Sequence, residues 1–335
     1  MKNRTLPKLD LNITNRCNFR CTHCAFDSGI IPMSELTLGE LEKILTETRE
    51  LGGERFDITG GEPLVRDDVE DIIKIGKNLG YKIELVTNGS LLTQEKLKRF
   101  KELGLDGIAI SLDGSTPEAY NRIRKRNKET FERVLENIKK TKEAGFYTKI
   151  NTTVFSCNLK DLPNITELAL SLGADEQGIY YFTPVGRGNR SRELAVEPLS
   201  WLDFIRTRLK EYQGRGMKIS LEFPLIEREY QDCKSGCIAN NEKSHLQILP
   251  DGKVYPCAIL ASYGRPLANL REVSIKDIWN NEPLWADYWA KLSTMFETFG
   301  GYCVDFKSAF QMREYDCQKY GFVCPLRKSK LEDIK

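Results

Sequence analysis

Residues 9–24 read LDLNITNRCNFRCTHC and join a short alternating apolar run to three closely spaced cysteines. The alternation over Leu9–Thr14 predicts a β-strand. Cys17, Cys21 and Cys24 follow in the next loop, and βα folds carry their chemistry in the loops at the carboxyl ends of strands. The segment therefore predicts a strand whose C-terminal loop gathers three thiols at the functional edge of the fold.

This strand is the first of a series, because similar runs alternate with amphipathic stretches at a spacing of roughly 25 to 35 residues. The amphipathic stretch Leu36–Leu51 predicts a helix, with Thr37 and Glu40 at the spacing of a capping box and glycines after its end. The βα order predicts an α/β fold with six parallel strands, as a barrel or an open sheet. The other five strands are expected at Arg55–Thr59, Lys82–Thr87, Gly107–Leu112, Thr148–Val154 and Gln177–Thr183.

Composition limits the function. The 335 residues include 50 basic and 48 acidic ones, so the net charge of +2 gives no general reason to expect nucleic acid or a membrane surface as partner. No stretch approaches the roughly 18 apolar residues of a membrane span, and the N-terminus lacks a secretory signal. We therefore expect a cytoplasmic protein whose ten cysteines stay reduced and serve as metal ligands or catalysts.

The chain has only two histidines, His23 and His245, which argues against a Ser-His-Asp hydrolase and against a multi-histidine metal centre. Thiolates bind iron–sulfur clusters, and three local cysteines leave one iron of a four-iron cluster open unless a distant ligand completes it. Structural zinc with His23 as the fourth ligand is the alternative, although His23 and Cys24 are adjacent in the sequence.

Polar motifs follow the next three predicted strands. They are Thr59-Gly60-Gly61-Glu62-Pro63, Thr87-Asn88-Gly89 and Ser111-Leu112-Asp113-Gly114. Paired glycines let the backbone approach a ligand closely, and a glutamate adds a carboxylate acceptor. Each motif alone is also a common turn, but four successive strand ends with such groups predict one binding site.

In this order and position the four motifs resemble the radical S-adenosylmethionine (SAM) superfamily, across the whole first part of the chain. The resemblance implies a partial (β/α)6 TIM-like barrel and a [4Fe–4S] cluster on Cys17, Cys21 and Cys24 that chelates SAM. It implies reductive cleavage of SAM to a 5′-deoxyadenosyl radical, which abstracts a hydrogen atom from the substrate. The cofactor-binding residues that it implies are His23, Gly60, Gly61, Glu62, Pro63, Thr87, Asn88, Ser111, Asp113 and Arg124. Arg124 follows Tyr120-Asn121, where a large subgroup has His-Asp, so a solvated basic helix face is the alternative for Arg124.

The last third of the chain is rich in cysteine, and Leu246–Leu249 and Lys253–Tyr255 flank a Pro-Asp-Gly turn. These features resemble the SPASM and Twitch cluster-binding extensions and imply a small domain of a β-hairpin and helices. We expect a radical SAM core at residues 1–215 and an auxiliary [4Fe–4S] domain at residues 216–335. The expected ligands are Cys237, Cys257, Cys317 and Cys324, with Cys233 and Cys303 as alternates and a zinc ribbon as the alternative.

The resemblance favours modification of a ribosomally synthesised peptide by epimerisation, crosslinking or thioether formation. A free thiol on Cys303, Cys233 or Cys157 is a candidate hydrogen donor, although for Cys157 a small buried residue is the favoured interpretation. Because the first strand begins near residue 9, no N-terminal peptide-recognition domain is expected, which counts against a leader-dependent substrate. The alternatives are a small-molecule oxidoreductase acting on an amino-sugar, cyclitol or tetrapyrrole, and a non-catalytic electron-transfer or metal-binding protein. The electron donor implied is a ferredoxin or flavodoxin.

Overall fold

Parallel β-strands and outer helices form the fold of the computed structural model. It describes residues 5–29, 33–196, 200–201, 204, 207, 209–212, 214–222, 226–227, 245–256, 258–262, 265–288 and 322–323. The strands are β1 (Lys8–Asn12), β2 (Arg55–Thr59), β3 (Lys82–Thr87), β4 (Gly107–Ser111), β5 (Tyr147–Val154), β6 (Glu176–Tyr181), β7 (Lys218–Glu222), β8 (Ile226–Glu227), β9 (His245–Ile248), β10 (Lys253–Tyr255), β11 (Ala268–Asn269) and β12 (Phe322–Val323). The six predicted strands are confirmed, each within two residues of its predicted ends.

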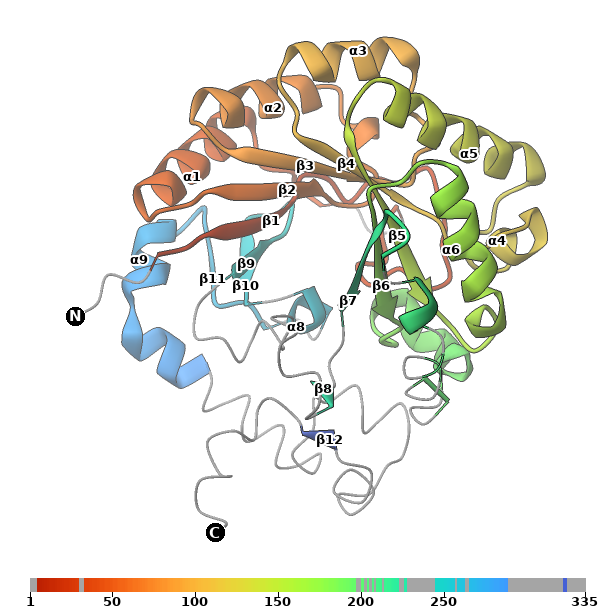
Figure 1. Cartoon of the computed structure of the whole chain (residues 1–335). Helices are drawn as coiled ribbons and strands as arrows, with labels where there is room; N and C mark the ends of the chain where they lie inside the picture. The colour runs from red at the N-terminus through yellow and green to blue at the C-terminus, as the bar shows by residue number, and fades with distance from the viewer. Residues whose placement is uncertain are drawn as a thin grey trace.

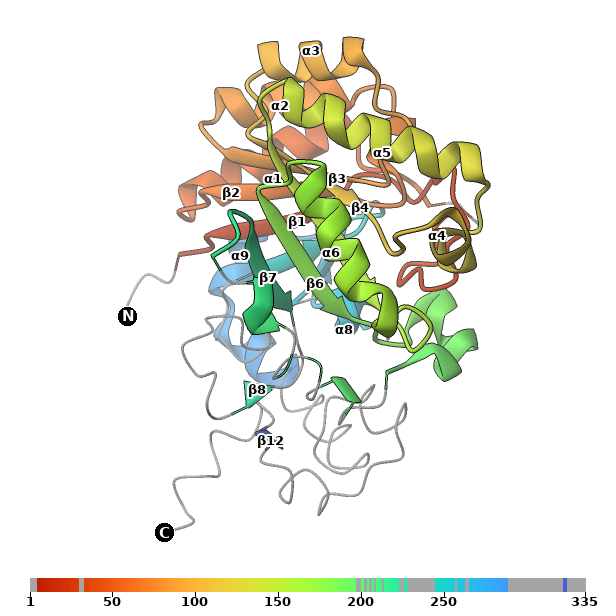
Figure 2. The same cartoon turned by 45° about the vertical axis from the view of Figure 1, so that its right-hand side comes forward.

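Ten of these strands form one sheet in the order β11-β10-β9-β1-β2-β3-β4-β5-β6-β7. Strands β1 to β7 pair in parallel, so their carboxyl ends meet along one edge of the sheet. The sheet is curved, with β7 beyond β6 at its end (Figure 2). This arrangement confirms an α/β fold with a partial barrel, and it adds β7 and β9 to the six expected parallel strands.

Helices cover the outer side of the curved sheet (Figure 1). They are α1 (Leu38–Glu50), α2 (Val69–Asn78), α3 (Gln94–Glu102), α4 (Pro117–Arg124), α5 (Lys128–Glu143) and α6 (Leu162–Ser171), with short turns η1 (Pro63–Val65), η2 (Leu159–Asp161), η3 (Gly186–Leu194) and η4 (Leu209–Tyr212). The capping box of α1 is present, because the Thr37 hydroxyl accepts from the Glu40 N–H and the Glu40 carboxylate accepts from the Thr37 N–H. Two further helices, α8 (Ala258–Ser262) and α9 (Ile275–Asn280), belong to the C-terminal part.

Strand alternation divides the sheet into two faces. Leu9 and Leu11 of β1 are fully buried and belong to the same core as Leu41 and Leu45 of α1. The residues between them point to the opposite side, which we call the inner face of the sheet. Burial of the apolar residues against the helices thus leaves the polar strand residues facing the inside of the partial barrel.

Ion pairs fill the lower part of the inner face, near the amino ends of the strands. Lys8 bridges Asp10 at 3.1 Å and Asp57 at 2.8 Å, and His245 of β9 lies 3.1 Å from Asp10. A second group surrounds the Glu176 carboxylate, which accepts hydrogen bonds from Tyr147 (2.8 Å), Lys218 (3.0 Å) and Ser220 (2.7 Å). These contacts join strands across the width of the sheet.

Replacing Glu176 with glutamine is expected to lower the free energy of unfolding at pH 7 by about 2 kcal/mol, since hydrogen bonds to a buried charge are lost. Burial alone raises the pKa of Glu176, but the hydrogen bonds from Ser220, Tyr147 and Lys218 outweigh it and hold the pKa at about 2. The carboxylate therefore stabilises the fold above its ordinary pKa, and this contribution is lost as the pH falls towards 2.

Urea unfolding of wild type and Glu176→Gln at several pH values measures this effect. The difference between them should shrink as the pH falls below about 4.5. The exposed Glu54 serves as control, and Glu54→Gln should unfold like wild type. An unchanged difference down to pH 2.5 would contradict the prediction.

The C-terminal hairpin continues the core sheet. β9 pairs in parallel with β1 and antiparallel with β10, with the turn at Gly252 in the left-handed region (φ +86°). Gln247 donates to the Asn12 carboxamide at 2.9 Å. The predicted hairpin is confirmed, and the sheet runs through the expected domain boundary at residues 215/216. That boundary stays a prediction.

Candidate cluster and cofactor site

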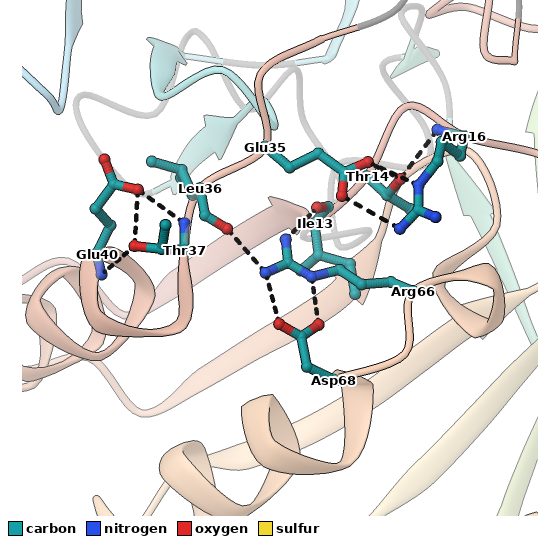
Figure 3. A network of polar contacts seen from close by, with 9 residues as sticks. All are labelled: Ile13, Thr14, Arg16, Glu35, Leu36, Thr37, Glu40, Arg66 and Asp68. Carbon is teal, nitrogen blue, oxygen red and sulfur yellow. Dashed lines mark hydrogen bonds and ion pairs between the residues drawn. The ribbon is translucent and has the colours of Figure 1, made fainter.

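The loop that carries the three cysteines is fixed at both of its stems (Figure 3). The buried guanidinium of Arg66 donates to the Ile13 carbonyl at 2.7 Å and to the Leu36 carbonyl at 2.8 Å. Asp68 holds the other side of the same guanidinium. Glu35 makes a second bridge, since it accepts from the Thr14 hydroxyl and pairs with Arg16. Sequence reasoning missed both bridges.

The glycines after β2 allow the cysteine loop to pack against this strand end. The Gly61 N–H donates to the Thr14 carbonyl at 2.8 Å, and the Glu62 N–H donates to the Arg16 carbonyl at 2.9 Å. A Cβ on Gly61 would lie 2.2 Å from the Arg16 carbonyl oxygen, and Gly60 has a φ of +143°. Only glycine fits this close backbone approach.

Glu62 points into the protein rather than out of it. Its side chain is fully buried and accepts hydrogen bonds from the Leu64 N–H (3.1 Å), the Thr87 hydroxyl (2.7 Å) and the Asn88 N–H (2.7 Å). Burial raises the pKa of this carboxyl group, and the three donors oppose that rise. Glu62 therefore joins the ends of β2 and β3, while Pro63 begins the turn η1.

Asn18 connects the cysteine loop to the end of β3. Its carboxamide accepts from Asn88 at 2.8 Å and donates to Ser90 at 2.9 Å. Sequence reasoning did not single out Asn18 or Ser90. Three motifs that are far apart in the sequence, the cysteine loop and the turns after β2 and β3, thus meet in one hydrogen-bonded edge.

Each cysteine of the loop has an N–H donor near its sulfur. The Phe19 N–H lies 3.3 Å from Cys17, the Ser28 N–H lies 3.3 Å from Cys24, and Arg124 Nη1 lies 3.8 Å from Cys21. Burial raises the pKa of Cys17 to about 12 and raises that of Cys21. As free thiols Cys17 and Cys21 would stay protonated, and bound iron is what would deprotonate them.

The arrangement of the thiols suits a cluster better than a single ion. In the described part of the chain, no three metal-binding side chains come close enough to hold one ion. The three cysteines nevertheless belong to one loop, residues 17–24. In a [4Fe–4S] cluster each thiolate binds a different iron, so the sulfurs stand apart around a cube. This donor set fits the cluster.

A buried charge cluster lies beside Cys21. Arg124 Nε donates to Asp113 Oδ2 at 2.6 Å, and the other Asp113 oxygen accepts from the Thr153 N–H at 2.8 Å. Asp113 is fully buried and Arg124 nearly so. The alternative of a solvated basic helix face is therefore wrong for Arg124, because it lies on the buried side of α4 together with Tyr120 and Ile123.

His23 is held as a neutral ring in this environment. Its Nε2 lies 3.9 Å from Asp113, and its ring packs against Phe155 with centroids 5.2 Å apart. Burial, and after it the charge of Arg124, lowers the pKa of His23 to about 4. A neutral ring is suited to pack against a flat heterocycle.

Several buried polar atoms around the loop have no hydrogen-bond partner among the described residues. They are Thr22 Oγ1, His23 Nδ1, Ser28 Oγ, Tyr120 Oη and Asn121 Oδ1. Buried polar groups in native proteins are almost always satisfied, so such a concentration points to a polar ligand. With the three thiols and the glycine-packed backbone, these atoms fit a cluster and SAM.

Of the remaining candidate residues, the structure describes Ser111 and Cys157 but not the C-terminal cysteines. Ser111 ends β4 on the inner face, half-buried. Cys157, after β5, packs against Ile123, Phe155 and Phe182, and burial raises the pKa of its thiol. Its role as hydrogen donor stays a prediction. The six C-terminal cysteines, Cys233, Cys237, Cys257, Cys303, Cys317 and Cys324, lie outside the described residues.

A curved parallel sheet with a thiol-bearing loop after its first strand and close-packed glycines after its second defines an iron–sulfur α/β enzyme core. The model of the radical SAM superfamily matches residues 11–169, and that of the SPASM iron–sulfur cluster-binding domain matches residues 237–303. By these matches the chain contains a radical SAM domain followed by a SPASM domain. These domains imply a SAM-binding [4Fe–4S] cluster and an auxiliary cluster.

Relatives cover most of the chain. An AdoMet-dependent heme synthase of Methanosarcina barkeri is 29% identical over 291 residues, 80% of each protein. SuiB of Streptococcus suis, bound to its precursor peptide SuiA, has a TM-score of 0.70 at 16% identity, covering 84% of this chain and 66% of SuiB. The enzyme anSMEcpe with bound AdoMet has a TM-score of 0.69 at 17% identity, covering 98% of this chain and 97% of its own. At these identities the two solved structures show the fold alone.

None of the helices in the described part of the chain has the length and apolar character needed to span a bilayer.

Proposed function

We propose that this enzyme abstracts a hydrogen atom from a ribosomally synthesised peptide. When bound, the cluster and SAM supply a 5′-deoxyadenosyl radical. The protein's own part is to fix the cysteine loop through Arg66 and Asn18, and to shield the site with buried side chains. A ferredoxin or flavodoxin is proposed as electron donor, and the four residues Cys237, Cys257, Cys317 and Cys324 as auxiliary ligands.

The observation that carries the peptide proposal is the polar upper part of the inner face, where the described side chains of β4, β5 and β6 are uncharged. Ser111 of β4 is in register with Asn151 of β5, and Thr153 of β5 is in register with Tyr180 of β6. All four are half-buried and lie near the carboxyl ends of their strands, next to the site. Hydroxyl and carboxamide groups both donate and accept, which matches the N–H and C=O groups of a peptide.

Charges on the lower inner face support the same choice. Lys8 is paired with two aspartates, and Lys149 and Lys218 are paired with Glu176. A cation already paired with a protein carboxylate loses that partner if it turns to a substrate carboxylate. The inner face therefore favours a neutral polar substrate over a polyanionic one.

A tetrapyrrole is the second candidate, because the 29% identity to an AdoMet-dependent heme synthase extends over 80% of both proteins. Such a substrate carries carboxylates and a wide apolar ring. Its carboxylates would have to compete with Asp10, Asp57 and Glu176 for the cations of the inner face.

The test compares 5′-deoxyadenosine formation by the reconstituted enzyme with peptides encoded beside the gene and with a propionate-bearing iron tetrapyrrole. We expect a peptide to raise the rate at least tenfold, and deuterium from a perdeuterated peptide to enter 5′-deoxyadenosine. Asn151→Leu should raise the peptide KM by about tenfold, or about 1.4 kcal/mol, with unchanged SAM cleavage in the absence of peptide. Exposed Glu54→Leu is the matched control. Stimulation by the tetrapyrrole alone would favour the second candidate.

A further inference from the structure

We propose that Arg124, oriented by Asp113, raises the reduction potential of the SAM-binding cluster by donating a hydrogen bond to the Cys21 sulfur. The proposal rests on the cluster that the radical SAM match implies, but not on the identity of the substrate. It gives Arg124 a positioning and tuning role through the protein rather than contact with the substrate.

The direction of the Arg124 guanidinium is fixed by its partners. Nε donates to Asp113 at 2.6 Å, and Nη1 lies 3.8 Å from the Cys21 sulfur. The orientation of the Asp113 carboxylate is itself restricted, because its second oxygen accepts a hydrogen bond from the Thr153 N–H at 2.8 Å. The planar guanidinium therefore carries a fixed charge between one carboxylate and one cluster ligand.

Cys21 differs from the other two ligands in the kind of donor it meets. Cys17 and Cys24 accept backbone N–H groups from their own loop, whereas the donor to Cys21 is a cation on helix α4, 103 residues further along the chain. Cys21 is also the most buried of the three, with 8% of its surface exposed. A charged hydrogen bond is strongest in such a low-dielectric place.

The sign of the effect follows from the electron count. Reduction adds one electron, supplied by dithionite in vitro, and makes the cluster more negative by one charge. A nearby cation and a hydrogen bond to sulfur both stabilise the more negative form, so they raise the potential. The Asp113 carboxylate opposes this by offsetting part of the Arg124 charge.

The experiment is a redox titration of the reconstituted full-length chain, followed by the EPR signal of the reduced cluster. The SAM-binding cluster is the signal that changes when SAM is added and that is missing when its three cysteines are alanine. Arg124→Lys keeps the positive charge but loses the planar guanidinium, whose two nitrogens contact Asp113 and the Cys21 sulfur at the same time. We expect about a tenfold fall in the ratio of reduced to oxidised cluster at a fixed potential, or about 59 mV for one electron.

Asp113→Asn provides the opposite test, since it leaves the Arg124 charge unshared and should shift the midpoint to a higher potential. A purely structural role of the pair would damage the site in the same way in both variants, so shifts of opposite sign support tuning. Arg122→Lys is the matched control, because Arg122 lies exposed on the same helix and should leave the midpoint unchanged.

Two outcomes would overturn the proposal. One is a wild-type midpoint in Arg124→Lys protein that holds its full iron content. The other is a shift of the same sign in Arg124→Lys and Asp113→Asn. Iron content and the SAM-induced change of the EPR signal report on the cluster without any substrate, so a wrong peptide assignment would not affect the result.

Discussion

Replacing Cys17, Cys21 and Cys24 together with alanine is expected to lower the iron content from about eight to about four atoms per chain, and to abolish SAM cleavage. We propose the three thiols as the cluster ligands of the loop, and each sulfur has its own N–H donor. Without them no iron remains open to SAM. Anaerobic reconstitution, iron and sulfide analysis, and detection of 5′-deoxyadenosine with dithionite measure the effect.

Cys157→Ala is the control, because this thiol is half-buried outside the loop and should leave iron content unchanged. The alanines should cost little stability in the metal-free protein, because Cys17 and Cys24 are only partly buried. An iron content of only four atoms per chain in wild type would contradict an auxiliary cluster on the C-terminal cysteines and would favour zinc at that site. SAM cleavage by the triple variant would contradict the assignment of the loop.

The fold could largely be predicted from the sequence because the strands follow two local rules. Apolar alternation marks the face buried against the helices, as with Leu9 and Leu11, and capping residues such as Thr37 mark where helices begin. The parallel pairing of β9 with β1 could not be predicted in this way, because it joins residues more than 230 positions apart, as in the contact of Gln247 with Asn12. No local pattern encodes such a pairing.

The site was predicted as a set of motifs but not as a set of contacts. Parallel topology alone brings the strand ends together, and the sequence contains that information. The inward turn of Glu62 could not be foreseen, because a glutamate in a glycine turn is usually solvated. The burial of Arg124 had a signal, since Tyr120, Ile123 and Arg124 follow the i, i+3, i+4 spacing of one helix face.

Arg66 had no comparable signal, and its replacement is expected to have the second large effect. Arg66→Met should lower the free energy of unfolding of the metal-free protein by about 3 kcal/mol, since it leaves two buried carbonyls and a carboxylate without their donor. The two carbonyls belong to Ile13 and Leu36, one at each stem of the cysteine loop. The variant should therefore also take up less iron than wild type under the same reconstitution conditions.

The matched control for Arg66→Met is Arg99→Met, which removes an arginine of similar pairing from the surface. Arg99 contacts Glu70 at 3.1 Å and Glu102 at 3.3 Å, with half of its side chain exposed, so its loss should destabilise the fold far less than the loss of Arg66. Arg66→Lys should lie between the two, because one ammonium cannot reach both carbonyls and Asp68 in the planar arrangement of a guanidinium. Urea unfolding of the three variants gives the free energies, and an equal loss in Arg66→Met and Arg99→Met would show that the loop stems do not depend on the Arg66 bridge.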